Sequence, residues 1–122
     1  MLFANSCLVV ADNSGAKVVK CIKILGGSFH TCGGVGDFFV VAVQTRTPDS
    51  KYLKKKIQLG LVVGTRKLLR RRAGNYIQFG ENRILLLSDK TKFMSSRVDG
   101  PIATEIRLKK IFKIVSLADV IV

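Results

Sequence analysis

Short apolar segments separated by glycine-rich turns limit the folds open to this chain more than any other feature of its sequence. The segments are four to eight residues long and cover residues 7–10, 18–25, 38–43, 58–65, 75–79 and 83–87. Runs of this length, bounded by glycine and other turn-forming residues, are typical of β-strands. A series of short strands predicts an antiparallel sandwich or a small closed barrel. Closure is favoured because a closed barrel leaves no exposed strand edges.

The last quarter of the chain has a different pattern, which predicts helices. The segment Asp99-Gly100-Pro101 predicts a helix start, because proline is favoured at the first helical position, where its missing N–H costs nothing. Glu105 and Lys109 are four residues apart, in the order that favours an ion pair along a helix. Residues 112–118 form either a second short helix or a final strand. We therefore expect a C-terminal helical segment at about residues 100–118.

Length and composition indicate one folded domain. The chain has 122 residues, close to the usual size of a single domain, and 48% of them are hydrophobic, which is enough for a core. No apolar run approaches the ~20 residues that span a bilayer, so we expect no membrane partner. The expected architecture is a mainly β protein with a single domain over residues 1–122.

The positive charge of the chain is concentrated in one segment. The formal net charge is +13, and residues 51–72 contain nine lysines and arginines without any acidic residue. A solvated surface needs only a modest net charge, and like charges placed this close repel one another. Phosphates are the usual counter-charge. An anionic membrane surface is less favoured, because a predicted strand at 57–64 interrupts the block where an amphipathic helix would be needed.

The sequence lacks the residue groups that small enzymes use. Its single histidine, His30, has no acidic partner nearby in the sequence, and the eight carboxylates are scattered. No G-x-x-x-x-G-K-S/T phosphate loop is present. His30 and Cys32 are two metal-ligand types, whereas a structural zinc site needs four ligands. We therefore expect no enzyme, no metal and no cofactor, with a site assembled from residues distant in sequence as the weaker alternative.

The cysteines and the first residues bear on the cellular compartment. Cys7, Cys21 and Cys32 are odd in number and form no C-x-x-C pair, which favours free thiols in a reducing compartment. Residues 1–11 are apolar, but they lack the basic start and the small-residue cleavage site of a signal peptide. No arginine precedes Arg46, so an arginine-rich transit peptide is not expected.

Motifs that agree in order and spacing with one known family run along almost the whole chain. They are Val9–Lys17 (VVADNSGAK), Cys21–Ser28 (CIKILGGS), Gly36-Asp37, Gly60–Val63, Arg66-Lys67, Arg70-Arg71, Gly74–Ile77, Phe79–Asn82, Arg97, Gly100-Pro101, Glu105–Arg107 and Lys113–Ala118. Together they resemble the universal large-subunit ribosomal protein family fourteen, in its bacterial and organellar form.

The resemblance implies a fold and a function. The fold is a small five-stranded antiparallel β-barrel with two short C-terminal helices, to which the sequence between Val63 and Tyr76 adds a β-hairpin extension. The function is that of a structural constituent of the large ribosomal subunit, which binds large-subunit rRNA and touches small-subunit rRNA in inter-subunit bridges. Other implied partners are neighbouring large-subunit proteins and a ribosome-silencing factor. The alternative, from another class, is a free RNA-binding β-barrel or RNA chaperone acting outside the ribosome.

Two groups of residues are the candidate binding sites. Basic residues that can neutralise phosphates are expected to contact RNA: Lys17, Lys20, Lys23, Lys51, Lys54, Lys55, Lys56, Arg66, Lys67, Arg70, Arg71 and Arg72. The resemblance implies a second surface, which faces the small subunit or the silencing factor: Arg46, Ser96, Arg97 and Lys113. Tyr76 and Phe79 could stack on bases, but core packing is favoured for the phenylalanine. Binding is therefore expected to depend on RNA shape and backbone.

Several positions depart from the family pattern. Ala73 stands where Asp, Asn or Ser usually precedes the glycine, Gly80 replaces an Asp, and Val98-Asp99 replaces an apolar pair. Residues 119–122 lack the usual Pro-Glu. These changes indicate a fast-evolving lineage. With the missing transit peptide, they predict a protein encoded in a mitochondrion and working in ribosomes of the mitochondrial matrix. A plastid or the bacterial cytoplasm is the alternative.

Overall fold

The fold is described from a computed structural model that places residues 2–27, 31–48, 56–89, 92–109 and 112–122. His30, Lys51, Lys54 and Lys55 lie outside the described residues. The expectations for these four side chains therefore stay predictions.

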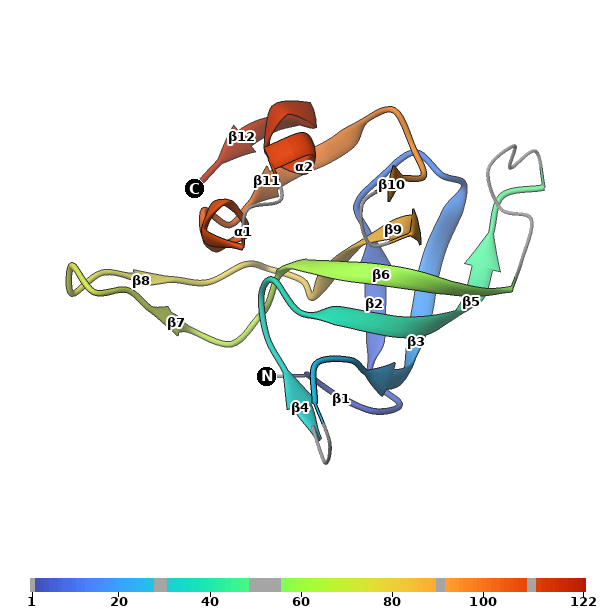
Figure 1. Ribbon diagram of the computed structural model, residues 1–122, viewed down its shortest axis with the longest axis horizontal. Coiled ribbons are helices and arrows are strands. Elements are labelled where there is room, and N and C mark those ends of the chain that lie inside the picture. Colours follow the sequence, from blue (N-terminus) through green and yellow to red (C-terminus); the bar gives the residue numbers. More distant parts are fainter. Residues whose placement is uncertain (1, 28–30, 49–55, 90–91, 110–111) are drawn as a thin grey trace.

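Five strands form a closed barrel (Figure 1). They are β2 (Cys7–Val10), β3 (Ala16–Ile24), β5 (Phe38–Arg46), β6 (Ile57–Gly64) and β9 (Arg83–Asp89). Neighbouring strands follow the order β9-β2-β3-β5-β6, and pairing of β6 with β9 closes the ring. This confirms the predicted five-stranded barrel.

One pairing in the ring is parallel, which the prediction of an antiparallel barrel did not include. Val9 and Val10 of β2 pair in parallel with Arg83 and Ile84 of β9, whereas the other four barrel pairings are antiparallel. The reason is topological. Strand direction cannot alternate all the way around a closed ring that has an odd number of strands.

The barrel interior is filled by aliphatic side chains, one phenylalanine and the Cys21 thiol. Alternate positions of each strand point inward, as the two-residue period of a strand requires. The inward side chains come from all five strands and include Leu8, Val19, Phe39, Val41, Val62, Ile84 and Leu86. Burial of such side chains stabilises the fold by about 1.5–3 kcal/mol each relative to full exposure.

The outer face of β6 and β9 is also buried, which explains why these two strands read as continuous apolar runs in the sequence. Leu61, Val63, Leu85 and Leu87 point outward from the barrel into a second core. The C-terminal part of the chain supplies the opposite side of this core through Val98, Ile102, Ile106 and Ile114.

The C-terminal part mixes strands with helices. It consists of β11 (Val98–Ile102), α1 (Glu105–Leu108), α2 (Phe112–Leu117) and β12 (Ala118–Ile121), and β11 pairs in parallel with β12. Residues 112–118 therefore contain both of the expected alternatives, a short helix followed by a strand. Neither helix in the described part of the chain is long and apolar enough to cross a membrane.

The predicted helix start at Asp99–Pro101 is wrong, because this segment lies in β11. Gly100 has a φ of +77°, a left-handed conformation that a right-handed helix does not contain. Pro101 and Ile102 pair instead with β12, and the Val122 N–H donates to the Ile102 carbonyl at 2.9 Å. The first helix begins at Glu105, so the helical segment is shorter than expected.

Small elements complete the fold. β1 (Leu2–Phe3) pairs with β4 (Cys32–Gly33), and β10 (Lys92–Phe93) pairs with β9. β7 (Leu69–Arg70) and β8 (Tyr76–Ile77) form a hairpin that projects away from the barrel on the left of Figure 1. This confirms the hairpin predicted between Val63 and Tyr76.

Candidate nucleic-acid interface

The hairpin tip is built by a glycine turn. The Gly74 N–H donates to the Arg71 carbonyl at 3.1 Å, and the Arg71 N–H donates to the Asn75 carbonyl at 2.9 Å. Gly74 has a φ of +85°, the left-handed position that short hairpin loops assign to glycine. Side chains of Arg70 and Arg72, on either side of Arg71, are exposed to solvent. The tip therefore presents two guanidinium groups close together in sequence.

The base of the hairpin is fixed to the barrel by polar contacts. The Arg66 N–H donates to Asn82 Oδ1 at 2.9 Å, and Gln78 Nε2 donates to the Arg66 carbonyl at 2.9 Å. The Phe79 ring packs over Gly64 and is buried, as its predicted core role requires. These contacts use backbone groups, so the side chains of Arg66 and Lys67 stay exposed.

Arg71 differs from the other basic residues of the hairpin, because its guanidinium binds within the protein. Nε lies 2.9 Å from Glu105 Oε1, Nη2 lies 3.3 Å from Glu105 Oε2, and Nη2 also donates to the Val122 carbonyl at 2.5 Å. Glu105 thus takes a partner 34 residues away, whereas the sequence suggested Lys109. The pair ties the hairpin to α1.

Lysines of β3 lie on the outside of the barrel. Lys17, Lys20 and Lys23 are exposed, while Val19 and Cys21 between them are buried in the barrel. Lys20 pairs with Ala42, which pairs with Ile57 on the next strand. The exposed Lys56 directly precedes Ile57, and its carbonyl accepts a hydrogen bond from the Val43 N–H at 2.9 Å, which places it at the end of the same sheet.

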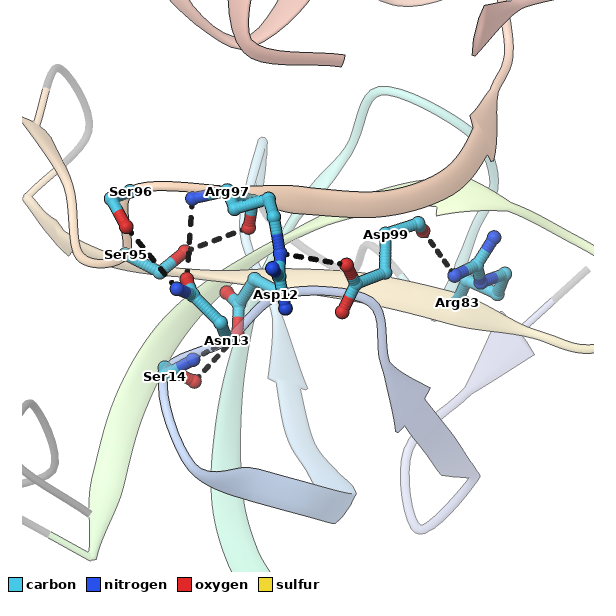
Figure 2. Close-up of polar contacts among 8 residues, drawn as sticks. All are labelled: Asp12, Asn13, Ser14, Arg83, Ser95, Ser96, Arg97 and Asp99. Atoms are coloured by element: carbon cyan, nitrogen blue, oxygen red, sulfur yellow. Dashed lines mark hydrogen bonds and ion pairs between the residues drawn. The ribbon is translucent and has the colours of Figure 1, made fainter. Parts of the chain in front are cut away.

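A second polar cluster joins the turn after β2 to the segment before β11 (Figure 2). Asn13 Nδ2 donates to Ser96 Oγ at 3.1 Å, and the Arg97 N–H donates to Asn13 Oδ1 at 3.2 Å. The Asp99 N–H donates to the Ala11 carbonyl at 2.7 Å. The turn therefore fixes the backbone that carries two of the residues assigned to the subunit-facing surface.

Asp12 anchors the same turn from inside. Its buried carboxylate accepts hydrogen bonds from the Ser14 N–H at 3.0 Å, from Ser14 Oγ at 2.5 Å and from the Leu86 N–H at 3.0 Å. Burial raises the pKa of Asp12 above its ordinary value of 3.8, because removal from water disfavours the charged form, and these hydrogen bonds offset only part of that effect.

Arg97 is exposed and held by a single acid. Its Nε lies 3.1 Å from Asp99 Oδ1, and the two side chains are 65% and 53% exposed. The Asp99 carbonyl in turn accepts a hydrogen bond from the Arg83 guanidinium of β9. Arg97 therefore has a defined backbone position and a charge that is only partly compensated in water.

The four residues of the predicted subunit-facing surface do not all meet. Ser96 and Arg97 lie together at the turn after β2, and Arg46, at the end of β5, pairs with Ala16 just beyond that turn. Lys113 is exposed on α2, in the C-terminal part. Sequence reasoning assigned no binding role to Asn13 and paired Glu105 with Lys109, so it missed the contacts of Asn13 with Ser96 and Arg97 and of Glu105 with Arg71. The Asx-turn pattern of Asp12-Asn13-Ser14-Gly15 was the available signal for the first.

The fold and the charge together define the class of protein, a small basic β-barrel with a projecting arginine-rich hairpin. Comparison with protein-family models is more specific, because the family described as Ribosomal protein L14p/L23e matches residues 1–122. The chain belongs to this family, which confirms the resemblance seen in the sequence. It is accordingly a structural protein of the large ribosomal subunit, from a family of proteins that are generally not enzymes.

Proposed function

We propose that this protein binds large-subunit rRNA mainly through the hairpin and the neighbouring outer face of the barrel. The observation that carries the proposal is the hairpin itself, which projects from the barrel (Figure 1) and leaves Arg66, Lys67, Arg70 and Arg72 exposed. Acidic side chains do not occur anywhere between residues 51 and 72. Like charges at this density favour a partner that supplies phosphates.

The chemistry of these side chains favours contact with RNA backbone. Arginine forks hold phosphate oxygens through two parallel hydrogen bonds and stack on exposed bases, while lysine ammonium groups act as point charges. The hairpin offers one exposed aromatic ring, Tyr76, which is 62% exposed. Readers of single strands normally present several such rings. Recognition therefore depends on the shape of a folded RNA.

We further propose a bridge to the small subunit. Arg97, Ser96 and Arg46 gather near the turn after β2, and Lys113 adds a cation on α2. The exposed Arg97 is the residue best placed to meet small-subunit rRNA, because its backbone is fixed by Asn13. A ribosome-silencing factor that docks on Ser96, Arg97 and Lys113 would cover the same surface and block subunit joining.

The proposed site of action is the mitochondrial ribosome. Support comes from departures in the family pattern, namely Ala73 before the hairpin glycine, Gly80 and Val98-Asp99. The structure accommodates Ala73, since the hairpin turn closes through backbone hydrogen bonds at Gly74 without a side-chain acceptor at position 73.

Sedimentation tests the assignment to large-subunit rRNA. The full-length protein is expected to migrate with large subunits in stoichiometric amounts on sucrose gradients at high salt. If about five cations neutralise phosphates, the affinity of the protein for large-subunit rRNA should fall with a log–log salt slope of roughly −3.5 to −4.5. Dissociation at moderate salt, with binding to unrelated RNA of equal strength, would instead identify a free RNA-binding protein.

A further inference from the structure

The two faces of the hairpin differ in exposure. Leu69 and Ile77 pair across the hairpin and are half-buried, whereas Arg70 and Tyr76 pair across it and are exposed. Successive side chains of a strand point to opposite faces of the sheet, so the two pairs lie on different faces. The exposed face of the hairpin, defined by Arg70 and Tyr76, therefore combines one guanidinium with one aromatic ring.

Arg70 and Tyr76 start from neighbouring positions. The Arg71 N–H donates to the Asn75 carbonyl at 2.9 Å, one position closer to the turn. Pairs in an antiparallel ladder alternate between hydrogen-bonded and non-hydrogen-bonded, so Arg70 and Tyr76 form a non-hydrogen-bonded pair. Side chains approach most closely in such pairs, where the Cβ atoms are about 4.5–5.5 Å apart. A ligand that covers the ring therefore lies within reach of the guanidinium.

Both side chains are available to a ligand. Tyr76 is 62% exposed, the largest exposed fraction among the large hydrophobic residues that the structure describes. Among the same residues, no carboxylate forms an ion pair with Arg70. An aromatic ring beside an uncompensated cation matches a nucleotide, which offers a flat base and a phosphate together.

We propose that the exposed face of the hairpin binds one unpaired base of large-subunit rRNA, which stacks on the Tyr76 ring while Arg70 contacts the phosphate of the same nucleotide. The inference rests on the proposed binding of rRNA by the hairpin and adds a base contact to contacts with the RNA backbone. A single ring suits a single nucleotide that a folded RNA turns out of its helix, because a run of single strand needs several rings.

The hairpin holds the ring in place before RNA arrives. Gly74 closes the turn, and Arg71 Nε lies 2.9 Å from Glu105 Oε1, which ties the hairpin to α1. A tyrosine side chain has only two rotatable angles, so little entropy is lost when it is ordered. Because binding pays less for ordering a preformed site, one stacked base contributes measurably to affinity.

The test measures filter binding of the full-length protein to large-subunit rRNA across a potassium chloride series. Tyr76→Ala should lower the affinity roughly 5- to 100-fold at every salt concentration, the usual effect of losing one stacked base. The log–log salt slope should stay unchanged, because the tyrosine neutralises no phosphate, whereas Arg70→Ala should reduce the slope by about 0.7–0.9.

Three further variants identify the interaction. Tyr76→Phe keeps the ring and should keep the affinity. Tyr76→Leu keeps apolar bulk without a ring and should lose affinity as Tyr76→Ala does. Leu68→Ala is the matched control, because Leu68 is 57% exposed just before β7 and lies outside the exposed face, so the affinity should not change. Ultraviolet crosslinking with mass spectrometry should join Tyr76 to an unpaired base.

The outcomes separate this inference from the proposed function. Unchanged affinity for Tyr76→Ala, with a reduced slope for Arg70→Ala, would overturn the stacked base and leave binding of rRNA by the hairpin intact. Unchanged affinity and slope for both variants would count against hairpin binding as well. Full affinity of Tyr76→Leu would contradict stacking and indicate apolar packing, as in a protein contact. A crosslink of Tyr76 to a paired base, or none at this residue, would also contradict the inference.

Discussion

At the residue scale, Asp12 and Asn13 together connect their own turn to β9 and to the segment before β11. The Asp12 carboxylate accepts hydrogen bonds from Ser14 in its own turn and from the Leu86 N–H of β9. Directly after it, Asn13 reaches Ser96 and Arg97. A short side chain with two acceptor oxygens is required here, because several donors converge from different directions.

The raised pKa of Asp12 predicts a specific pH dependence of stability. Because the folded protein binds this proton more tightly than the unfolded chain, the stabilisation is complete below pH 3.8, the ordinary pKa, and decreases as pH rises through the folded pKa. The asparagine in Asp12→Asn does not titrate and has one acceptor oxygen fewer. The substitution should lower the unfolding free energy by about 1–3 kcal/mol. Denaturant unfolding at several pH values from about 3 to about 8 tests this. The difference in unfolding free energy between wild type and Asp12→Asn should become smaller as pH rises. A difference in unfolding free energy that does not change with pH would contradict the raised pKa of Asp12.

The pair between Arg71 and Glu105 predicts a gain of RNA charge contacts when it is broken. Both side chains are only about a quarter exposed, at 28% and 23%, so Glu105→Gln should cost about 1–3 kcal/mol of unfolding free energy, more than the loss of an exposed ion pair. The released Arg71 should increase the log–log salt slope of binding to large-subunit rRNA by about 0.7–0.9. Filter binding measures this. Glu81→Gln, at an exposed acid, is the matched control, and an equal slope change there would refute the explanation.

At the element scale, the sequence was most informative where strands are regular. The expected segments 7–10, 38–43 and 83–87 lie within β2, β5 and β9, because hydrophobic runs between turns depend on local chemistry. The prediction of a helix start at Asp99–Pro101 was wrong, because pairing with β12 overrides the local sequence pattern there. That pairing depends on residues about 20 positions away.

The sequence predicted which residues of the candidate site are basic, but not how their side chains are arranged in space. The basic side chains were identified from the sequence, and four of the five that lie on the hairpin are exposed to solvent. Which cations bind inside the protein was not predictable, since the partners of Arg71 and Arg97 depend on tertiary structure. The same holds for Asn13, whose two contacts span more than 80 residues.

Closure of the barrel between β6 and β9 predicts that a side chain at Gly60 can be accommodated only if Ile84 shifts. A Cβ at this position would lie 2.5 Å from Ile84 Cδ1 and 2.9 Å from Ile84 Cγ1, which is too close for any real contact. Gly60→Ala should therefore destabilise the fold by about 1–3 kcal/mol. Adding Ile84→Val removes the methyl group that clashes and should recover part of the loss. Thermal or denaturant unfolding of the full-length single and double variants measures this. If the double variant lost the sum of the stability lost by Gly60→Ala and by Ile84→Val, the steric explanation would be refuted.

At the scale of the whole molecule, the net charge of +13 is divided between separate surfaces. The hairpin projects from one side of the barrel, whereas the turn between β2 and β3 lies at another end, beside the segment that leads to β11 (Figure 1). The C-terminal part covers β6 and β9 and contributes one side of the second core. One rigid barrel can thus present cations to two RNA partners in a fixed relative orientation.

This separation predicts that the two surfaces fail independently. Arg70→Ala combined with Arg72→Ala should lower the salt slope for large-subunit rRNA by roughly 1.4–1.8, because two phosphate contacts are lost, and should reduce incorporation into large subunits. Arg46→Ala combined with Arg97→Ala should leave incorporation normal and weaken joining to small subunits. Since distant sites act additively, the fourfold variant should show the sum of both losses. If the Arg46 and Arg97 variants also impaired incorporation, or the hairpin variants altered joining of subunits that had incorporated normally, the two surfaces would not be independent. The charge would then act on the RNA as a single field spread over the whole barrel.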